Sequence, residues 1–325
     1  MNLDFFVSVI IPVYNAAPFV RQAVESALAQ PETAEVLLVE DGSPDNALEI
    51  CRQLAAEYPQ VILLRHPNGE NRGAGASRNL GMRTATSPFL AFLDADDYYL
   101  PGRFMIDTKL YAENPSCEGV YHAISMHIED SEGLKRWNDA GKTLETIKTI
   151  NAEIPPDSLA EALLYGSLGH FSIDGLSIKK TVLERAGMMR EDLRLHQDTE
   201  WILRLAITAQ LYPGSLTEPV SRWRVHSQNR ISSPRDKVQK LDDNLSMWEG
   251  LYSWCKKRGE KRYLPVLMHL MLENVANKQR FEGTESPKFI RRVRRLTLLA
   301  SWLVRRPRYI GDCYFWRALS QFIGA

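Results

Sequence analysis

The sequence lacks an excess of charge of either sign. Lysine and arginine together number 40, as do aspartate and glutamate, and the formal net charge is +0 at pH 7. A chain without a net positive charge has no long-range attraction for nucleic acid, so we expect no nucleic-acid partner. The last forty residues differ, because from Ser286 onward basic residues greatly outnumber the one acid, Asp312. These basic residues are Lys288, Arg291, Arg292, Arg294, Arg295, Arg305, Arg306, Arg308 and Arg317.

Cysteine is scarce, and long hydrophobic runs are missing. The four cysteines have neither metal-ligand nor redox spacing, which favours reduced, buried thiols in a cytoplasmic protein. No basic stretch followed by an apolar core begins the chain, so we expect no signal peptide. The apolar run from Leu296 to Val304 is far shorter than the roughly 20 residues of a membrane-spanning helix.

No glycine follows the first predicted strand, where the sequence is Tyr14-Asn-Ala-Ala-Pro18. A sugar nucleotidyltransferase or an NAD dehydrogenase carries a glycine-rich phosphate loop at this position. Gly73 and Gly75 come too late in the chain to supply it. The absence argues against both classes, and we keep the nucleotidyltransferase only as a minor alternative.

Apolar strands alternate with amphipathic helices over the first hundred residues. The predicted strands are 7–13, 35–39, 61–64 and 89–93, and the predicted helices are 17–30, 45–58 and 74–85. This alternation predicts an α/β fold with a Rossmann-like, mostly parallel sheet flanked by helices. Ligands of such sheets bind beyond the carboxyl ends of the strands, so the residues that follow each strand are the candidates for a site.

The pattern is more varied after Asp97. We predict helices at 102–112, 181–186 and 198–209, strands at 119–128, 176–178 and 220–225, and an irregular segment at 130–157. Beyond residue 233 the chain favours helices at about 237–258, 264–280 and 287–304. We therefore expect a catalytic domain at 1–233, with a nucleotide-binding half at about 1–110 and an acceptor half at about 111–233. A basic, helical C-terminal region follows at 234–325.

Three carboxylates crowd the end of the fourth predicted strand, at Asp94, Asp96 and Asp97. Like charges so close together repel one another, and a divalent cation would relieve that repulsion. Mg²⁺ and Mn²⁺ prefer oxygen ligands and often combine one or two carboxylates with substrate phosphates. The structural alternative is a polar turn in which an aspartate caps the next helix.

The other strand ends carry residues suited to a nucleotide. Pro12 and Tyr14 end the first strand, and the ring of Tyr14 could lie against a base. Asp41 follows the second strand and could accept a hydrogen bond from an imide such as that of uracil. Arg78 could reach a base carbonyl or a phosphate. Each residue alone is a weak signal, since such residues are usually part of a turn or a solvated helix face.

Three segments together carry a family resemblance: VSVIIPVYNAAPFVRQAVESALAQ, EVLLVEDGSPDNALEI and ENRGAGASRNLGMRTATSPFLAFLDADD. In order and spacing they resemble glycosyltransferase family 2, with the A-type glycosyltransferase fold, densely over about residues 6–110. The resemblance implies a nucleotide-sugar donor, inverting transfer, and Mn²⁺ or Mg²⁺ held by Asp96. It also implies a donor nucleotide site at Pro12, Tyr14, Asn15, Glu40, Asp41, Arg78, Asp94 and Ala95. Glu40 stands where many relatives have Asp, so which of Glu40 and Asp41 touches the base stays open.

A later motif, HQDTEWILRLA, resembles the Glu-Asp motif that begins a helix in this family, in which the Asp is the catalytic base. Asp198 falls on that position, and Gln197 replaces the usual Glu. The structural alternative is that Asp198 or Thr199 merely caps the helix. Trp223-Arg-Val-His226 resembles a late strand of these enzymes, which ends in a His near the metal, and an ordinary surface histidine is the alternative.

The basic C-terminal segment combines arginines with apolar and aromatic residues. Phe289, Ile290, Leu296 and Leu299 recur at helical spacing, and Trp302, Tyr309, Tyr314, Phe315 and Trp316 are expected to add aromatic surface. Such a composition suits a helix on an anionic membrane surface. We therefore expect residues 286–325 to bind the inner face of a membrane peripherally, with packing on the catalytic domain and a homo-oligomer contact as alternatives.

The functional hypothesis is a metal-dependent inverting glycosyltransferase that transfers a sugar from a nucleotide-sugar, with UDP as the expected nucleotide. The acceptor is expected to be a hydroxyl of a saccharide or lipid-linked saccharide in bacterial-type cell-surface polysaccharide or glycolipid synthesis. The alternative from another class is a catalytically silent scaffold that binds a nucleotide-sugar. Gln197 is the one departure that supports the scaffold.

Overall fold

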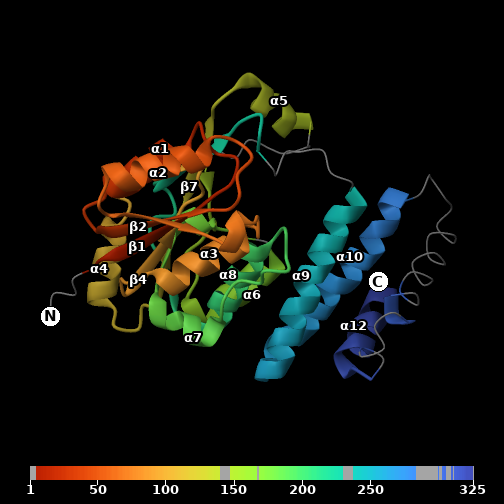
Figure 1. Ribbon diagram of the computed structural model, residues 1–325. Helices are drawn as coiled ribbons and strands as arrows, with labels where there is room; N and C mark the ends of the chain where they lie inside the picture. The colour runs from red at the N-terminus through yellow and green to blue at the C-terminus, as the bar shows by residue number, and fades with distance from the viewer. Residues whose placement is uncertain are drawn as a thin grey trace. The chain divides into compact units, whose positions relative to one another are not determined.

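The computed structural model describes residues 5–139, 147–166, 168–229, 237–282, 299, 302–304, 309 and 311–324 (Figure 1). The chain forms two compact units. Unit 1 comprises residues 1–194 and 201–233, and unit 2 comprises residues 195–200 and 234–325. The predicted catalytic domain at 1–233 and C-terminal region at 234–325 were defined by their expected functions, so that division stays a prediction.

A seven-stranded sheet is the centre of unit 1, with the order β10-β6-β9-β4-β1-β2-β3. Strand β1 pairs parallel with β2 and β4, and β2 pairs parallel with β3. Strand β9 runs antiparallel to both β4 and β6. The predicted mostly parallel α/β sheet is therefore confirmed. The strands are β1 (Val7–Val13), β2 (Thr33–Glu40), β3 (Val61–Arg65), β4 (Phe89–Phe92), β6 (Gly119–Tyr121), β9 (Leu176–Lys179) and β10 (Leu211–Pro213).

Helices cover both faces of this sheet (Figure 1). Val9 and Ile11 of β1 join one core cluster with Val24 of the first helix and Leu54 of the second. Ile10 points to the other face, where a Cβ on Gly81 would lie 2.5 Å from its Cγ2, so only glycine allows this close approach. The helices up to residue 208, of which α5 contacts a second sheet of unit 1, are α1 (Val20–Leu28), α2 (Ala47–Glu57), α3 (Ala74–Thr84), α4 (Met105–Glu113), α5 (Ser131–Asp139), α6 (Pro156–Tyr165), α7 (Leu183–Ala186) and α8 (Gln197–Thr208).

A second sheet of unit 1 has the order β5-β11-β7-β8. Its strands are β5 (Tyr98–Tyr99), β7 (Ile124–Ile128), β8 (Ile147–Lys148) and β11 (Ser221–Val225). The prediction of one strand at 119–128 is wrong, because β6 and β7 belong to different sheets. Between them the backbone N–H of His122 donates to the carbonyl of Gly175, and that of Ala123 donates to the carbonyl of Ser215.

The segment 130–157, which we predicted to be irregular, contains helix α5 and strand β8. Helix α5 has few apolar residues, so its sequence gives little sign of a buried face. Trp137 lies edge-on against Trp223 of β11, with ring centroids 5.0 Å apart. Tertiary packing of this kind stabilises helices whose own pattern is weak.

Unit 2 is built from α9 (Lys237–Arg258), α10 (Leu264–Glu282) and α12 (Cys313–Gly324). Helix α10 is adjacent to both α9 and α12. The core of the unit includes Leu251 and Tyr252 of α9, Met268 and Met271 of α10, and Phe315 of α12. Among the residues that the structure describes, no helix is long and apolar enough to cross a membrane.

The predicted helix at 287–304 lies mostly outside the described residues. The expectation that the C-terminal aromatic residues add surface is wrong for Trp302, Tyr309 and Phe315, which are buried. The rings of Trp302 and Tyr309 stack with centroids 5.0 Å apart, and the Trp302 indole N–H donates to Glu249 at 3.1 Å. These side chains stabilise unit 2 itself. Trp316, in contrast, is about half exposed.

Candidate functional site

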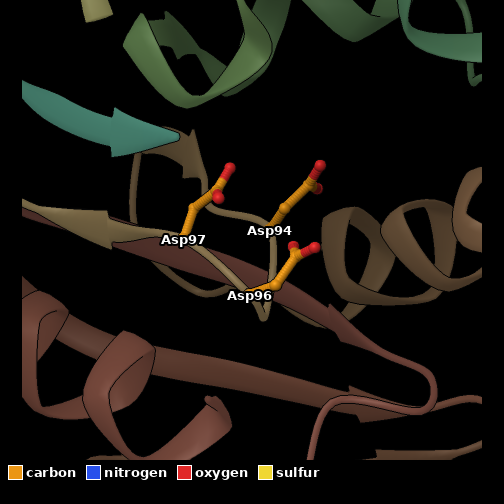
Figure 2. Close-up of side chains that lie close together, drawn as sticks. All are labelled: Asp94, Asp96 and Asp97. Atoms are coloured by element: carbon orange, nitrogen blue, oxygen red, sulfur yellow. The ribbon is translucent and has the colours of Figure 1, made fainter. Parts of the chain in front are cut away.

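Asp94, Asp96 and Asp97 lie in the turn between β4 and β5, and their carboxylates project to the same side of that turn (Figure 2). One carboxylate oxygen from each residue lies within 4.8 Å of the others. The Asp94 and Asp96 side chains are 41% and 32% exposed, whereas Asp97 is buried. The three acids therefore differ in access to a ligand from solution.

Asp94 forms an ion pair with Arg78 of α3. The predicted donor nucleotide site includes both residues. Arg78 Nη2 contacts Asp94 Oδ1, and the arginine itself is buried. The backbone N–H of Asp94 donates to Asp174 Oδ1 at 3.1 Å. The structure thus brings together two of the residues that we assigned to the donor nucleotide site. The sequence did not point to Asp174, whose only signal was an acid just before a predicted strand.

Asp97 and Asp174 form a buried pair of acids beneath the turn. Burial, together with the negative charges of Asp96 and Asp174, raises the pKa of Asp97 well above its usual range. Burial, together with the charge of Asp94, raises the pKa of Asp174 to about 7. The two side chains are hydrogen-bonded to each other, with Asp97 as the proton donor. Asp97 thus acts as a structural member of the turn.

Arg224 of β11 holds the turn that carries Asp94, Asp96 and Asp97 in place through hydrogen bonds. Its backbone N–H donates to Asp97 Oδ1 at 2.8 Å, and its Nε donates to the carbonyl of Asp96 at 2.7 Å. Its remaining nitrogens contact Glu129 and Gln22, the latter at 2.6 Å. The sequence motif Trp223–His226 gives no sign of a role for Arg224, because these partners are distant in the chain.

His226, which follows β11, reaches Asp96. Its Nε2 lies 3.1 Å from Asp96 Oδ2, and its ring packs against Phe19 with centroids 4.5 Å apart. The side chain is buried, so the alternative of an ordinary surface histidine is wrong. The Gln228 backbone N–H points at His226 Nδ1 from 3.2 Å, which makes Nδ1 an acceptor and assigns the ring proton to Nε2.

Glu40 is the last residue of β2 and Asp41 follows it, and both side chains are buried. Glu40 accepts hydrogen bonds from Arg65 at 2.8 Å and from the Ser43 N–H at 2.6 Å. Burial would raise the pKa of Glu40, but these two partners outweigh it and lower the pKa. The two oxygens of Asp41 accept the backbone N–H groups of residues 72 and 73, at 2.7 and 2.9 Å. Both acids therefore hold backbone in place around the predicted base site.

The end of β1 lies beside the end of β2, since Pro12 pairs with Val39 and Val13 with Glu40. Tyr14, which follows, is 53% exposed, so its ring is free to meet a ligand from solution. Asn15 has a left-handed backbone with φ of 54°, and its N–H donates to the Ser43 side chain at 3.3 Å. Ala95, in the carboxylate turn, is buried.

Asp198 lies in the first turn of α8, and its Oδ1 accepts the backbone N–H of Thr199 at 2.8 Å. Gln197 is buried, and its amide oxygen has no hydrogen-bond partner among the residues that the structure describes. His196, just before the helix, has a left-handed backbone with φ of 62°. These three residues belong to unit 2, whereas the other candidate site residues belong to unit 1.

Comparison with known proteins gives the family. A sequence model described as "Glycosyl transferase family 2" matches residues 8–173. An uncharacterized glycosyltransferase of Nostoc sp., alr2836, is 32% identical over 230 residues, covering 70% of this chain and 67% of that protein. The minor teichoic acid biosynthesis protein GgaB of Bacillus subtilis is 37% identical over 249 residues, which cover 76% of this chain and only 26% of GgaB.

The fold also matches solved structures. The structure of S. aureus TarS residues 1–349 in complex with UDP-GlcNAc aligns with a TM-score of 0.55, at 15% identity, over 98% of this chain and 80% of that one. At this identity the likeness concerns the fold alone. The match over residues 8–173 and the Nostoc relative show that the chain belongs to glycosyltransferase family 2, a family of transferase enzymes.

Proposed function

We propose that this glycosyltransferase is metal-dependent and inverting, and that it transfers a sugar from a nucleotide-sugar, with UDP as the nucleotide, to an acceptor hydroxyl. The observation that carries the proposal is the partly exposed pair Asp94 and Asp96 at the carboxyl end of β4, with His226 at 3.1 Å from Asp96. Parallel α/β sheets bind their ligands at this end of the strands.

The residues present suit Mn²⁺ or Mg²⁺. Asp96 offers a carboxylate that is open to solvent, and Asp94 lies beside it with an oxygen within 4.8 Å. His226 can ligate through Nε2 only after its ring proton moves to Nδ1, so we assign Asp96 as the main ligand and His226 as an auxiliary one. When bound, the cation would neutralise charge on the leaving diphosphate.

The nucleoside would lie along the ends of β1, β2 and β4. Tyr14 supplies an exposed ring for the base. Glu40 and Asp41 lie at the same place and are both buried and hydrogen-bonded, Glu40 to Arg65 and Ser43 and Asp41 to two backbone N–H groups, with His66 Nε2 at 3.5 Å from Asp41. We take Asp41 as the acid that meets the base, because Glu40 is neutralised by the guanidinium of Arg65. Arg78 holds Asp94 and offers positive charge on the same side.

Asp198 is our proposal for the general base. A carboxylate that takes the proton from the acceptor hydroxyl allows the oxygen to attack the sugar in a single displacement, which inverts the anomeric centre. Asp198 already accepts the Thr199 N–H, and it stands near the helix N-terminus. The helix dipole stabilises the ionised form that can accept a proton, but it also makes that carboxylate a weaker base.

The decisive experiment is a panel of nucleotide-sugars incubated with the protein and Mn²⁺, with release of free nucleoside diphosphate as the readout. We expect release with at least one donor, and anomeric analysis of the product should show inversion. Tight nucleotide binding without turnover for any donor or acceptor would instead identify the protein as a silent scaffold.

The biological setting that we propose is the synthesis of bacterial cell-surface polysaccharide or glycolipid, with a saccharide or lipid-linked saccharide as acceptor. The support is the name of GgaB, a protein of teichoic acid biosynthesis that shares 37% identity with this chain over 249 residues. The matched segment is 26% of GgaB, so the likeness concerns one part of that protein.

We also propose that the basic segment from residue 286 binds an anionic membrane surface. The support is its charge, since nine basic residues accompany one acid, Asp312, and that acid is already paired with Lys256. Deleting the segment would expose the core of unit 2, so charge removal is the cleaner test. Replacing Arg291, Arg292, Arg294 and Arg295 by Ser should abolish binding to anionic vesicles, with neutral vesicles as the control.

A further inference from the structure

Helix α5 and the residue before it hold the backbone of the turn that follows β11. Asp130 Oδ2 accepts the N–H of Ser227 at 3.1 Å, and Arg136 Nη1 donates to the carbonyl of Ser227 at 2.6 Å. Both backbone polar groups of one residue are thus bonded to side chains of one short segment. Asp130 Oδ1 in turn accepts the N–H of Gly133 at 2.5 Å, which ties the helix start to the same contact.

Gly133 brings the helix against the backbone of His226. A Cβ at Gly133 would lie 2.5 Å from the His226 Cα and 2.6 Å from its carbonyl carbon. These are backbone atoms, so a larger residue would have to move the turn or the helix. Glycine inside a helix costs about 1 kcal/mol relative to alanine. Close approach to His226 is the physical reason for a glycine at this position.

The helix is itself anchored. Trp137 is buried against Trp223 of β11, and Glu132 supports Arg136 at 3.2 Å one helical turn away. Helix α5 lies at the margin of unit 1 (Figure 1), yet it is connected to β11 at Trp137 and to the turn after β11 at Gly133 and Arg136. It can therefore fix the position of that turn.

The turn carries two side chains that reach Asp96. His226 Nε2 lies 3.1 Å from Asp96 Oδ2, and Asn229 Nδ2 lies 3.4 Å from the same oxygen. Asn229 also caps the turn, since its Oδ1 accepts the His226 N–H at 2.6 Å. A displacement of the turn would therefore change what surrounds the proposed metal ligand.

We propose that α5 is a positioning element of the metal site, and that Asp130, Gly133 and Arg136 act on Asp96 through the turn of His226 and Asn229. None of the three touches Asp96, so they are positioning residues and not catalytic ones. The inference rests on the proposed function, because it assigns these residues to the cation that Asp96 would hold. Interactions that orient metal ligands typically change metal affinity or activity 10- to 100-fold, about the effect expected here.

The test measures binding of UDP, and in parallel GDP, by calorimetry at increasing Mn²⁺ concentration. Gly133→Ala, which puts a methyl group against the His226 backbone, should raise the Mn²⁺ concentration needed for tight nucleotide binding by roughly 10-fold or more. Nucleotide affinity without metal should stay unchanged. Arg136→Gln should act in the same direction, and Arg136→Lys should recover part of the loss, since lysine can still donate to the Ser227 carbonyl.

Lys135→Ala is the matched control, because Lys135 is exposed on the same helix. It should leave the Mn²⁺ requirement at the wild-type value. Arg136 is also exposed, so its variants keep the test valid if Gly133→Ala does not fold.

The outcomes separate the two proposals. If wild-type protein requires Mn²⁺ for tight nucleotide binding, and Gly133→Ala and Arg136→Gln require the same Mn²⁺ concentration, the positioning role is overturned and the metal dependence stands. A wild-type protein whose nucleotide binding and transfer ignore Mn²⁺ would overturn the metal dependence and, with it, this inference.

Discussion

His122 donates a hydrogen bond of 2.7 Å to Asp107, with both side chains fully buried in unit 1. The Ser215 N–H bonds to His122 Nδ1 at 3.0 Å, so the ring proton lies on Nε2 and points at Asp107. Asp107 also accepts from Ser177 at 2.5 Å and from Arg103 at 3.3 Å. This network joins α4, β9 and the loops after β6 and β10, and it holds the interior of the main sheet together.

Acid should destabilise unit 1 through this network. Burial lowers the pKa of His122 and outweighs the opposing effect of Asp107. The unfolded chain binds a proton at histidine below about pH 6.5, whereas the folded network resists it, so stability falls as the pH drops below that value. The slope for one such group is at most about 1.4 kcal/mol per pH unit. Thermal unfolding at about pH 7.5 and about pH 5.5 measures the loss.

Protonation of Asp107 should also lower the stability of unit 1, at a lower pH than protonation of His122. Burial would raise its pKa, but His122, Arg103 and the hydrogen bonds outweigh burial and lower it. Its contribution is present above the unfolded carboxyl pKa of about 3.9 and is lost as the pH falls through the lower folded value. His122→Gln should flatten only the first part of the pH profile. An unchanged profile in that variant would show that another group causes the loss.

Asp96→Asn and Asp97→Asn form a matched pair at the metal site. Asp96→Asn should weaken Mn²⁺-dependent nucleotide binding by more than roughly 100-fold, since it removes a ligand and not merely a residue that orients one. Asp97→Asn should leave that binding nearly unchanged, because an amide can accept from the Arg224 N–H and donate to Asp174 as Asp97 does. Equal losses in the two variants would contradict our separation of ligand from structural acid.

Asp198→Asn should abolish transfer and leave donor binding intact. Loss of a general base typically lowers kcat by about 10²- to 10⁴-fold, and the amide has no basic oxygen to replace it. Nucleoside diphosphate release reports kcat, and calorimetry reports binding. Asp192→Asn is the control, because Asp192 precedes Asp198 in the chain and is an exposed acid paired with Arg190. Wild-type transfer in Asp198→Asn would eliminate Asp198 as the base.

Arg224→Lys should destabilise unit 1 and impair the carboxylate turn. One ammonium group cannot reach the Asp96 carbonyl, Glu129 and Gln22 together as the guanidinium does. Leaving buried partners unsatisfied costs about 1–3 kcal/mol. The thermal midpoint should therefore fall, and Mn²⁺-dependent binding should weaken. Arg222→Lys, two residues earlier on the same strand, should have a much smaller effect, since the bond that the Arg222 guanidinium makes within the described part of the chain is a long one of 3.4 Å to the Met126 carbonyl.

The structure differs most from the pattern of the sequence around residues 119–139. A strand was predicted across His122, because the alternation of side chains does not record which sheet a residue joins. Helix α5 was missed, because its buried face consists of little more than Gly133 and Trp137, and their partners are more than eighty residues away. Partners distant in the chain leave no local periodicity to detect.

The sequence by itself determined the α/β class, the family and the placement of polar residues at strand ends, because buried strands and amphipathic helices have distinct local patterns. The resemblance also assigned Arg78 and Asp94 to one predicted nucleotide site, and their direct contact is a finding of the structure. Only the tertiary structure decided how the acids differ. Asp96 is partly exposed with His226 beside it, whereas Asp97 is buried against Asp174. Burial and neighbouring charge fix the chemistry of a carboxylate, and both depend on residues that fold together from distant parts of the chain.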